Sequence, residues 1–426
     1  TRDEILKHAV AIKYYPRDKL KTLRTITLKG QMDATSLLKQ TSSPIDYLRV
    51  SFSYLNSQTL VPQMSGTMNV ITRSNAFPGK HNVEFLPLID LPSTDINCIY
   101  TTLDFLQNQH KKLQLPGKPV IGFDQPLWQL AMIVKQQMSL DIVLLLGNFH
   151  TQSSFLGSIG YVMKNSGLEE ALGTIYGEAP MKKIFKGKSY ERAMRAHSLA
   201  TTVLKKMLLD SVEDDDKYII EEASRLFASL REENDTPVDL KAVANSPVVI
   251  DLLEVFEKIK VALSSHGTNR LFLEYITMND ILMRNLHAER LGNWQEYITS
   301  LKLMLPYLAA TGHRAYTKCV SWFLQELEEL DEFTLSEFEK GHFVVRRSSR
   351  PYAGVSVDLA IEQSLMASLK GNGGLTHGRT FNELNYLIWI LSRPVVSKID
   401  LLLRDFTKVD YHTDEQSSHK IEKYEG

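Results

Sequence analysis

The sequence has few cysteines and no long apolar run. Its two cysteines, Cys98 and Cys319, lie far apart and lack the neighbouring Cys or His residues of a zinc site, which argues against a disulfide framework and against structural zinc. The longest apolar stretches, such as "DIVLLLG", are too short to span a bilayer, and the charged N-terminal stretch "TRDEILKHAVAIKYYPRDK" lacks the apolar core of a signal peptide. We therefore expect an intracellular protein, nuclear or cytoplasmic, with no membrane partner.

The sequence also lacks an excess of charge. The formal net charge is −1 and the pI is about 6.9, so no overall positive field attracts nucleic acid, and any such binding must use local patches. Hydrophobic residues make up 43% of the chain and charged residues 23%, which is typical of a globular protein. A length of 426 residues favours two or three structural units, and the first residue, Thr1, suggests a fragment or a processed product.

The clearest structural pattern is "VIGFDQPLWQLAMIVKQQMSLDIVLLLGNFHT", residues 120–151. It predicts a short buried strand over 120–123, a helix that begins after Asp124, and a second strand that ends near Gly147. Upstream, the alternation in "YLRVSFSYL" and "HNVEFLPLIDLP" predicts two further strands, and "STDINCIYTTLDFLQNQHKK" predicts a helix. This order predicts an α/β fold with a mixed sheet and right-handed parallel crossovers.

A different pattern follows. Residues 155–340 read as a series of amphipathic helices, "GHFVVRRSSRPYAG" reads as a strand or turn, and "VSVDLAIEQSLMASLK" reads as a helix. We therefore expect an all-helical insertion that interrupts the α/β fold. The predicted units are an N-terminal segment of uncertain fold (1–45), the first part of the core (46–155), the helical insertion (156–340), the final part of the core with an acidic helix (341–400) and a C-terminal tail (401–426).

Three acidic residues are candidates for a site. Asp124 ends a strand at the edge where open α/β sheets place their ligands, although it is equally placed to cap the helix that follows. Asp358 and Glu362 are four residues apart on one face of a helix that is otherwise apolar around them. Buried acids are costly unless a cation or another partner satisfies them. Carboxylates that converge on a pair of Mg²⁺ or Mn²⁺ ions are the basis of two-metal phosphoryl transfer.

At this point the sequence resembles a family of animal transposon-related proteins. The similarity lies in the blocks "FDQPLW", "LGNFHT", "SFLGSIGYVMKNSGL" and "DLAIEQSLMASLKGNGGLTHGR", and it runs from about Val83 to Arg379. The organisation is similar in turn to that of Mutator-like and hAT transposases. The resemblance implies a ribonuclease-H-like mixed sheet flanked by helices, with Asp124 and Glu362 as the second and third acids of a DDE triad and as the metal ligands. It also matches His150 to the histidine that follows the next strand.

The sequence departs from this family pattern at the first acid of the triad. Asp46 precedes a predicted strand instead of ending it, and Asp90 falls on what would be the third strand. Either the first acid lies upstream of Thr1, or the protein is a non-catalytic descendant.

Other candidate residues have more than one interpretation. His150 is a candidate proton shuttle, metal ligand or DNA contact, or a structural histidine bonded to Asn148 or to the backbone. The glycine-rich "GNGGLTHGR" is either a phosphate cradle or a helix stop. Basic residues that could neutralise phosphates, or that form solvated faces, cluster in two short segments, and one further basic candidate lies outside them. They are Lys182, Lys183, Lys186, Lys188, Arg192 and Arg195; Arg346, Arg347 and Arg350; and Arg379.

Two functions follow from these observations. The first is a transposase-derived DNA-binding protein that, with a complete triad, cleaves and transfers DNA strands with Mg²⁺ or Mn²⁺, with Asp358 and His150 beside the metal ligands. The second is a catalytically inactive, domesticated module that binds nucleic acid or protein. DNA is the expected partner in the first case, and a second copy of the chain is a further candidate partner. An unrelated α/β hydrolase is disfavoured because the sequence has no G-x-S-x-G elbow or P-loop.

Overall fold

The computed structural model describes most of the chain between residues 91 and 363. The described residues are 9–16, 22–26, 44–53, 70–72, 79–81, 86, 89, 91–232, 237–346 and 352–363, with the single positions 395, 399 and 402. The predicted strand "HNVEFLPLIDLP" and the glycine-rich "GNGGLTHGR" lie wholly or largely outside these residues.

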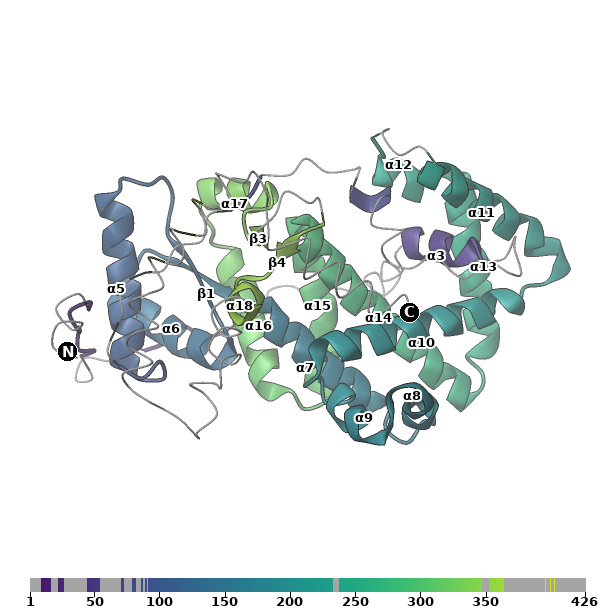
Figure 1. The fold of residues 1–426 in the computed structure, drawn as a ribbon, viewed down its shortest axis with the longest axis horizontal. Coiled ribbons are helices and arrows are strands. Elements are labelled where there is room, and N and C mark those ends of the chain that lie inside the picture. Colours follow the sequence, from purple (N-terminus) through teal and green to yellow (C-terminus); the bar gives the residue numbers. More distant parts are fainter. Residues whose placement is uncertain are drawn as a thin grey trace.

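Helices make up most of the described residues, and four short strands accompany them. In chain order the elements are α3 (Pro44–Ser51), α5 (Ile96–Lys112), β1 (Val120–Phe123), α6 (Gln125–Met138), β2 (Val143–Leu146), α7 (Asn148–Val162), α8 (Leu168–Tyr176), α9 (Glu178–Ile184), α10 (Tyr190–Asp210), the 3₁₀ turn η2 (Asp214–Asp216), α11 (Lys217–Glu232), α12 (Leu240–Ala244), α13 (Pro247–Leu263), α14 (Gly267–Leu291), α15 (Trp294–Ala310), α16 (Arg314–Leu327), α17 (Glu332–Glu339), β3 (Val345–Arg346), β4 (Gly354–Val355) and α18 (Val357–Ile361). Figure 1 shows α5, α6 and β1 at one end of the molecule and α3, α11 and α13 at the other, with α14 and α15 between them.

The unit β1–α6–β2 forms as the sequence predicts. The two strands pair in parallel, with Phe123 opposite Leu146, and α6 connects them. Trp128 of α6 fixes this unit on its neighbours, because its indole N–H donates to the carbonyl of Leu144 (3.3 Å) and its ring packs edge-on against Trp322 of α16 (5.7 Å between centroids). In the stretch after residue 341, predicted as a strand or turn, the described residues include two short strands, β3 and β4, which pair in antiparallel fashion.

The prediction of a ribonuclease-H-like mixed sheet is wrong. Within the described residues the strands form two sheets of two strands each, and the protein is mostly helical. The alternating stretch that begins at Tyr47 forms the buried helix α3 and a turn instead of a strand, because its surroundings are helices that bury almost every side of it. Helix α18 packs against β1, and its Val357 lies against Gly122 of that strand.

Two large hydrophobic clusters make up most of the core of the described residues, and a third, of three buried residues, lies at β4 and α18. The larger joins α5, α6, β2 and α7 to α14, α15 and α16, so it crosses the boundary predicted near residue 155, and the division into units stays a prediction. The smaller joins α3, α10, α11, α13 and α14 at the other end. In the described part of the chain, no helix combines the length and the apolar character needed to cross a membrane.

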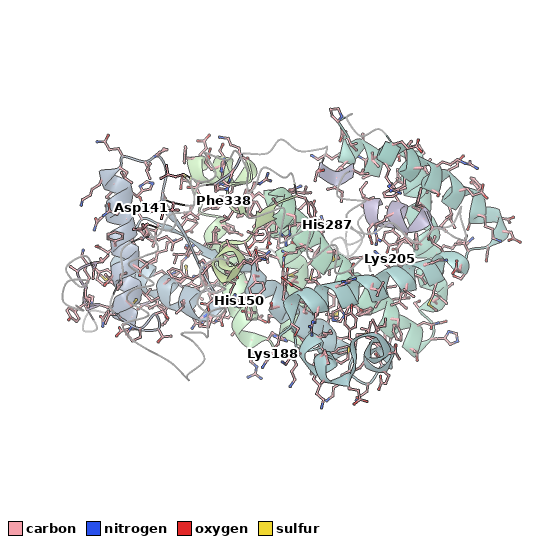
Figure 2. The ribbon with its side chains drawn as sticks, in the orientation of Figure 1. Asp141, His150, Lys188, Lys205, His287 and Phe338 are labelled. Atoms are coloured by element: carbon pink, nitrogen blue, oxygen red, sulfur yellow. The ribbon has the colours of Figure 1, made fainter. Side chains whose placement is uncertain are left out.

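A buried ion network ties α3 to the second cluster. The ammonium of Lys205 (α10) lies 2.5 Å from a carboxylate oxygen of Asp46 (α3) and 2.5 Å from one of Asp280 (α14), and its side chain is fully buried. Figure 2 shows Lys205 among the helices of this end of the molecule. Burial alone would raise the pKa of Asp46, but the nearby Lys205 and Arg49 lower it well below its usual range. Asp46 is therefore a partner in a structural network.

Candidate functional site

Asp124 and the start of α7 lie at the same edge of the small sheet, because the carboxyl ends of parallel strands meet there. Asp124 is the N-cap of α6, and its Oδ1 accepts a hydrogen bond from the backbone N–H of Leu127 (3.3 Å). The capping role expected for Asp124 is thus confirmed. Satisfying an unpaired N–H in this way stabilises a helix by about 1 kcal/mol.

Asp358 supplies the cap that α7 lacks. The N-cap position of α7 is Gly147, which has no side chain to offer. The carboxylate of Asp358, on α18, accepts the backbone N–H groups of Phe149 (3.3 Å) and His150 (3.1 Å). A carboxylate at this position also interacts favourably with the positive end of the helix dipole.

His150 completes an ion pair with the same carboxylate. Its ring Nδ1 lies 3.0 Å from Asp358 Oδ2, and its side chain is one-third exposed. Burial alone would lower the pKa of His150, but the hydrogen bond and charge of Asp358, together with the charges of Asp124 and Glu362, raise it above its ordinary value. Burial would raise the pKa of Asp358, and the bonds that it accepts from His150 lower it instead. The pair is therefore charged over a wider pH range than either residue would be alone.

The structure thus gathers four residues that the sequence proposed for the site, which we call the acid–histidine cluster: Asp124, His150, Asp358 and Glu362. Their arrangement does not fit the expected metal centre. Among the described residues, no three His, Cys, Asp or Glu side chains are placed to hold a metal ion together. Asp358, beside the predicted ligands Asp124 and Glu362, already contacts two N–H groups of α7 and the ring of His150.

A buried polar network lies behind this cluster, and the sequence reasoning missed it. The amide of Asn148 donates to Asn285 Oδ1 (3.0 Å) and to the carboxyl of Glu289, both on α14. Gln152, one turn further along α7, donates to Asn285 Oδ1 (2.7 Å). Burial raises the pKa of Glu289 to about 7, although the hydrogen bond from Asn148 opposes this shift. The spacing of Asn285 and Glu289, four residues apart on one helix face, is the signal that would have indicated such a network.

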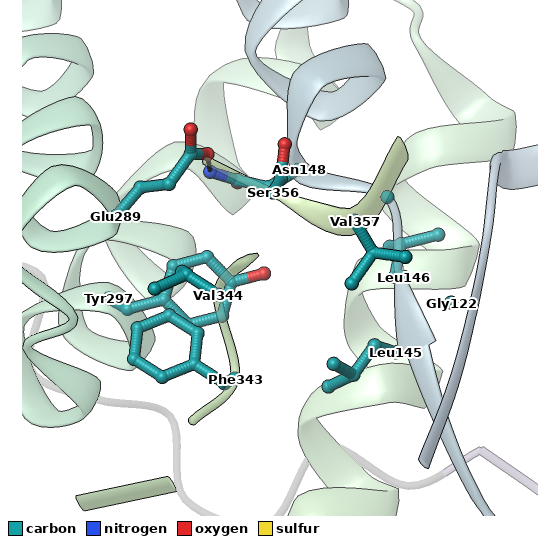
Figure 3. Close-up of a pocket in the computed structure, with 11 residues that line it drawn as sticks. Gly122, Leu145, Leu146, Asn148, Glu289, Tyr297, Phe343, Val344, Ser356 and Val357 are labelled. Atoms are coloured by element: carbon teal, nitrogen blue, oxygen red, sulfur yellow. Dashed lines mark hydrogen bonds between the residues drawn. The ribbon is translucent and has the colours of Figure 1, made fainter. Parts of the chain in front are cut away.

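A small cavity adjoins this network, as Figure 3 shows. Its volume is about 20 Å³, enough for one water molecule. Gly122, Leu145 and Val357 form one side, and Tyr297 and Phe343 form the other. The cavity is too small for a substrate.

The predicted basic residues gather beside the first turns of α7. Lys182 and Lys183 end α9, Lys186 and Lys188 lie in the loop that follows, and Arg192 and Arg195 lie on α10; all six are exposed. We call these six residues the basic surface. The loop is held against α7, because the ring of Tyr190 packs on Phe149 (4.9 Å between centroids) and its hydroxyl donates to Gln152. Figure 2 labels Lys188 and His150.

The other predicted basic residues are not part of this surface. Arg346 is buried, with 2% of its surface exposed, and its guanidinium donates to the carbonyl of Leu291 (2.9 Å). Arg347, Arg350 and Arg379 lie outside the described residues.

Comparison with known families places the chain in one of them. The family model described as a domain of unknown function, DUF8702, matches residues 63–424, and the chain belongs to this family. Searches of the curated proteins and of the solved structures returned no match.

Proposed function

We propose that this protein is a transposase-derived module that binds DNA without cutting it. The observation that carries the proposal is the basic surface: residues 178–195 contain six basic and two acidic side chains, in a chain whose formal net charge is −1. Lys182, Lys183, Lys186 and Lys188 form no ion pair with any residue that the structure describes. Exposed lysines of this kind can contact the phosphodiester backbone.

The acid–histidine cluster supports the non-cleaving form of the proposal. Two-metal cleavage needs several carboxylates free to bind cations, whereas Asp358 is committed to α7 and His150, and Asp124 caps α6. The family resemblance at "FDQPLW" and "LGNFHT" supports the transposon origin, since these blocks contain Asp124 and His150 themselves.

The test is a binding titration with a fluorescein-labelled DNA duplex, followed by anisotropy over a range of salt concentrations. We expect the double variant Lys182→Gln/Lys183→Gln to bind more weakly and to flatten the slope of log K against log salt by about 1.8, which is about 0.9 for each lost phosphate contact. The matched control is Lys111→Gln/Lys112→Gln, an adjacent pair of exposed lysines in the last turn of α5. This control should bind like the wild type.

Two results would count against the proposal. Equal binding by the wild type and the α9 variant would remove the basic surface as the binding site. Duplex nicking that depends on Mg²⁺ or Mn²⁺ and is lost in both Asp124→Asn and Glu362→Gln would show that the protein cuts DNA.

A further inference from the structure

A groove on the outer face of α16 is not explained by the acid–histidine cluster or by the basic surface. Its volume is about 490 Å³, and Ile26, Ala309, Arg314, Thr317, Lys318 and Ser321 line it. Four of these residues belong to α16 and are spaced three, one and three apart, which places them on one face of the helix. Ile26 and Ala309 come from other segments and give the groove an apolar part. The groove is therefore of the size that holds a small ligand or one unit of a polymer.

The groove carries positive charge that is not neutralised. Arg314 and Lys318 are exposed, and neither forms an ion pair with a residue that the structure describes. Among the described residues, no carboxylate lines the groove. The acid further along α16, Glu326, pairs with Lys135 (2.7 Å). The remaining positive charge thus faces solvent beside an apolar wall.

The wall that contains Ile26 is held in place. The backbone N–H of Arg24 donates to Gln136 of α6 (3.2 Å), and the Arg24 guanidinium pairs with Glu329 (2.5 Å). The side-chain amide of Gln325, on α16, donates to the carbonyl of Thr25 (3.4 Å). These three contacts, at Arg24 and Thr25, hold the chain immediately before Ile26.

The groove also lies close to the basic surface. His313, which precedes α16, has its Nδ1 2.7 Å from Ser154 Oγ of α7. One turn further, Gly157 of α7 lies between the His313 ring and the carbonyl of Lys186, since a Cβ at Gly157 would be 3.2 Å from the ring and 3.6 Å from that oxygen. The residue before α16 and the loop of the basic surface therefore approach each other at Gly157 of α7.

We propose that this groove binds the sugar–phosphate backbone of one strand of the bound DNA, with Arg314 and Lys318 on the phosphates and Ile26 and Ala309 against the sugar. This inference rests on the proposed function, because it extends the path of the DNA from the basic surface across α7 to α16. Contacts with phosphate and sugar position the DNA and carry no sequence information. Binding by the groove is accordingly independent of DNA sequence.

The experiment uses the same labelled duplex and the full chain. We expect Arg314→Gln/Lys318→Gln to lower the affinity and to flatten the salt slope by about 1.8, the value for two lost phosphate contacts. The control, Lys241→Gln/Arg270→Gln, removes the same charge from exposed positions on α12 and α14.

A second pair of variants tests the groove without removing a cation. Ile26→Glu places a negative charge in the groove and should weaken DNA binding, whereas Leu23→Glu, outside the lining of the groove, should not. Circular dichroism confirms that each variant is folded.

The outcomes separate the two proposals. Wild-type protein that does not bind the duplex overturns both. Binding that needs Lys182 and Lys183 but is unchanged by Arg314→Gln/Lys318→Gln and by Ile26→Glu overturns the groove alone. Equal losses in the groove variant and in its control would show that only total charge matters, which also overturns the groove.

Discussion

His150 and Asp358 are separated by 208 residues in the sequence and joined by one hydrogen bond of 3.0 Å between the imidazole Nδ1 and the carboxylate. The same carboxylate accepts two backbone N–H groups at the start of α7. One side chain therefore fixes the end of β2, the start of α7 and the position of α18.

Replacing Asp358 with Asn should lower the pKa of His150 and destabilise the protein by about 1–3 kcal/mol, because a charge-assisted set of hydrogen bonds is lost. The pKa of His150 is raised in the folded protein, so its contribution is fully present below the ordinary histidine pKa of 6.5 and is lost as the pH rises through the folded value. The stability difference between wild type and variant should therefore shrink at alkaline pH. An NMR titration of His150 and urea unfolding at several pH values measure both effects. An unchanged His150 pKa would contradict the pairing.

Gly147 is required by the same carboxylate. A Cβ at this position would lie 2.5 Å from Asp358 Oδ2 and 3.0 Å from the carbonyl of Phe123. We expect Gly147→Ala to destabilise the protein by about 1–3 kcal/mol, the usual range for overpacking. Gly173→Ala, inside α8, meets no atom within 4 Å and should stabilise it by about 0.5–1 kcal/mol, because alanine is the better helix former. The measurement is the thermal unfolding of both variants. Equal changes in stability would contradict the close contact between Gly147 and the Asp358 carboxylate.

Glu289 should make stability depend on pH. Its pKa is raised from 4.5 to about 7 by burial, so the folded state holds a proton that the unfolded state releases. Stability should fall as the pH rises from about 4.5 to 7, by roughly 3 kcal/mol from this group. Glu289→Gln keeps the shape and removes the titration, so its unfolding free energy should be flatter across this range. A wild-type profile identical to that of the variant would show that Glu289 does not titrate in this way.

Lys205 and Lys206 offer a matched pair of adjacent lysines. Lys205 is fully buried between Asp46 and Asp280, whereas Lys206 is half exposed and pairs with Asp210 (3.6 Å). We expect Lys205→Met to destabilise the protein by about 3–5 kcal/mol, because it removes the buried cation that Asp280 shares with Asp46, and of these two carboxylates only Asp46 pairs with a second cation in the described structure, Arg49. Lys206→Met should change stability by no more than about 0.5 kcal/mol. Chemical denaturation of the two variants compares them, and a small effect at both sites would mean that the buried network contributes little.

The sequence predicted the β1–α6–β2 unit correctly, because the residues that specify each of its elements lie within or next to that element. The strand over 120–123, the helix that begins after Asp124 and the second strand up to Leu146 are all present, because short apolar runs and a capping residue specify them within a few positions. The strand predicted from Tyr47 onward was wrong, because its alternation of apolar and polar residues also fits a short helix buried among other helices. Tertiary surroundings, which the sequence does not display, decided between the two.

The acid–histidine cluster was found in part by resemblance and in part by position. That Asp124, His150 and Glu362 would lie near one another followed from the family pattern, and their mutual charge effects are seen in the raised pKa of His150. The commitment of Asp358 to a distant helix end could not be read from the sequence, because no local spacing indicates which helix a carboxylate will cap. For Glu289 the four-residue spacing from Asn285 is a local signal, but it does not indicate the partner Asn148, which is 141 residues away.

The remote cap on α7 has a consequence for how the chain is made. During synthesis the segment from β1 to α7 leaves the ribosome roughly 200 residues before α18, and domains generally fold in the order in which they emerge. Until Asp358 has been synthesised, the N–H groups of Phe149 and His150 must bond to water. The amino-terminal end of α7 therefore lacks its cap during this time. Full stabilisation of the segment from β1 to α7 is thereby coupled to the synthesis of α18.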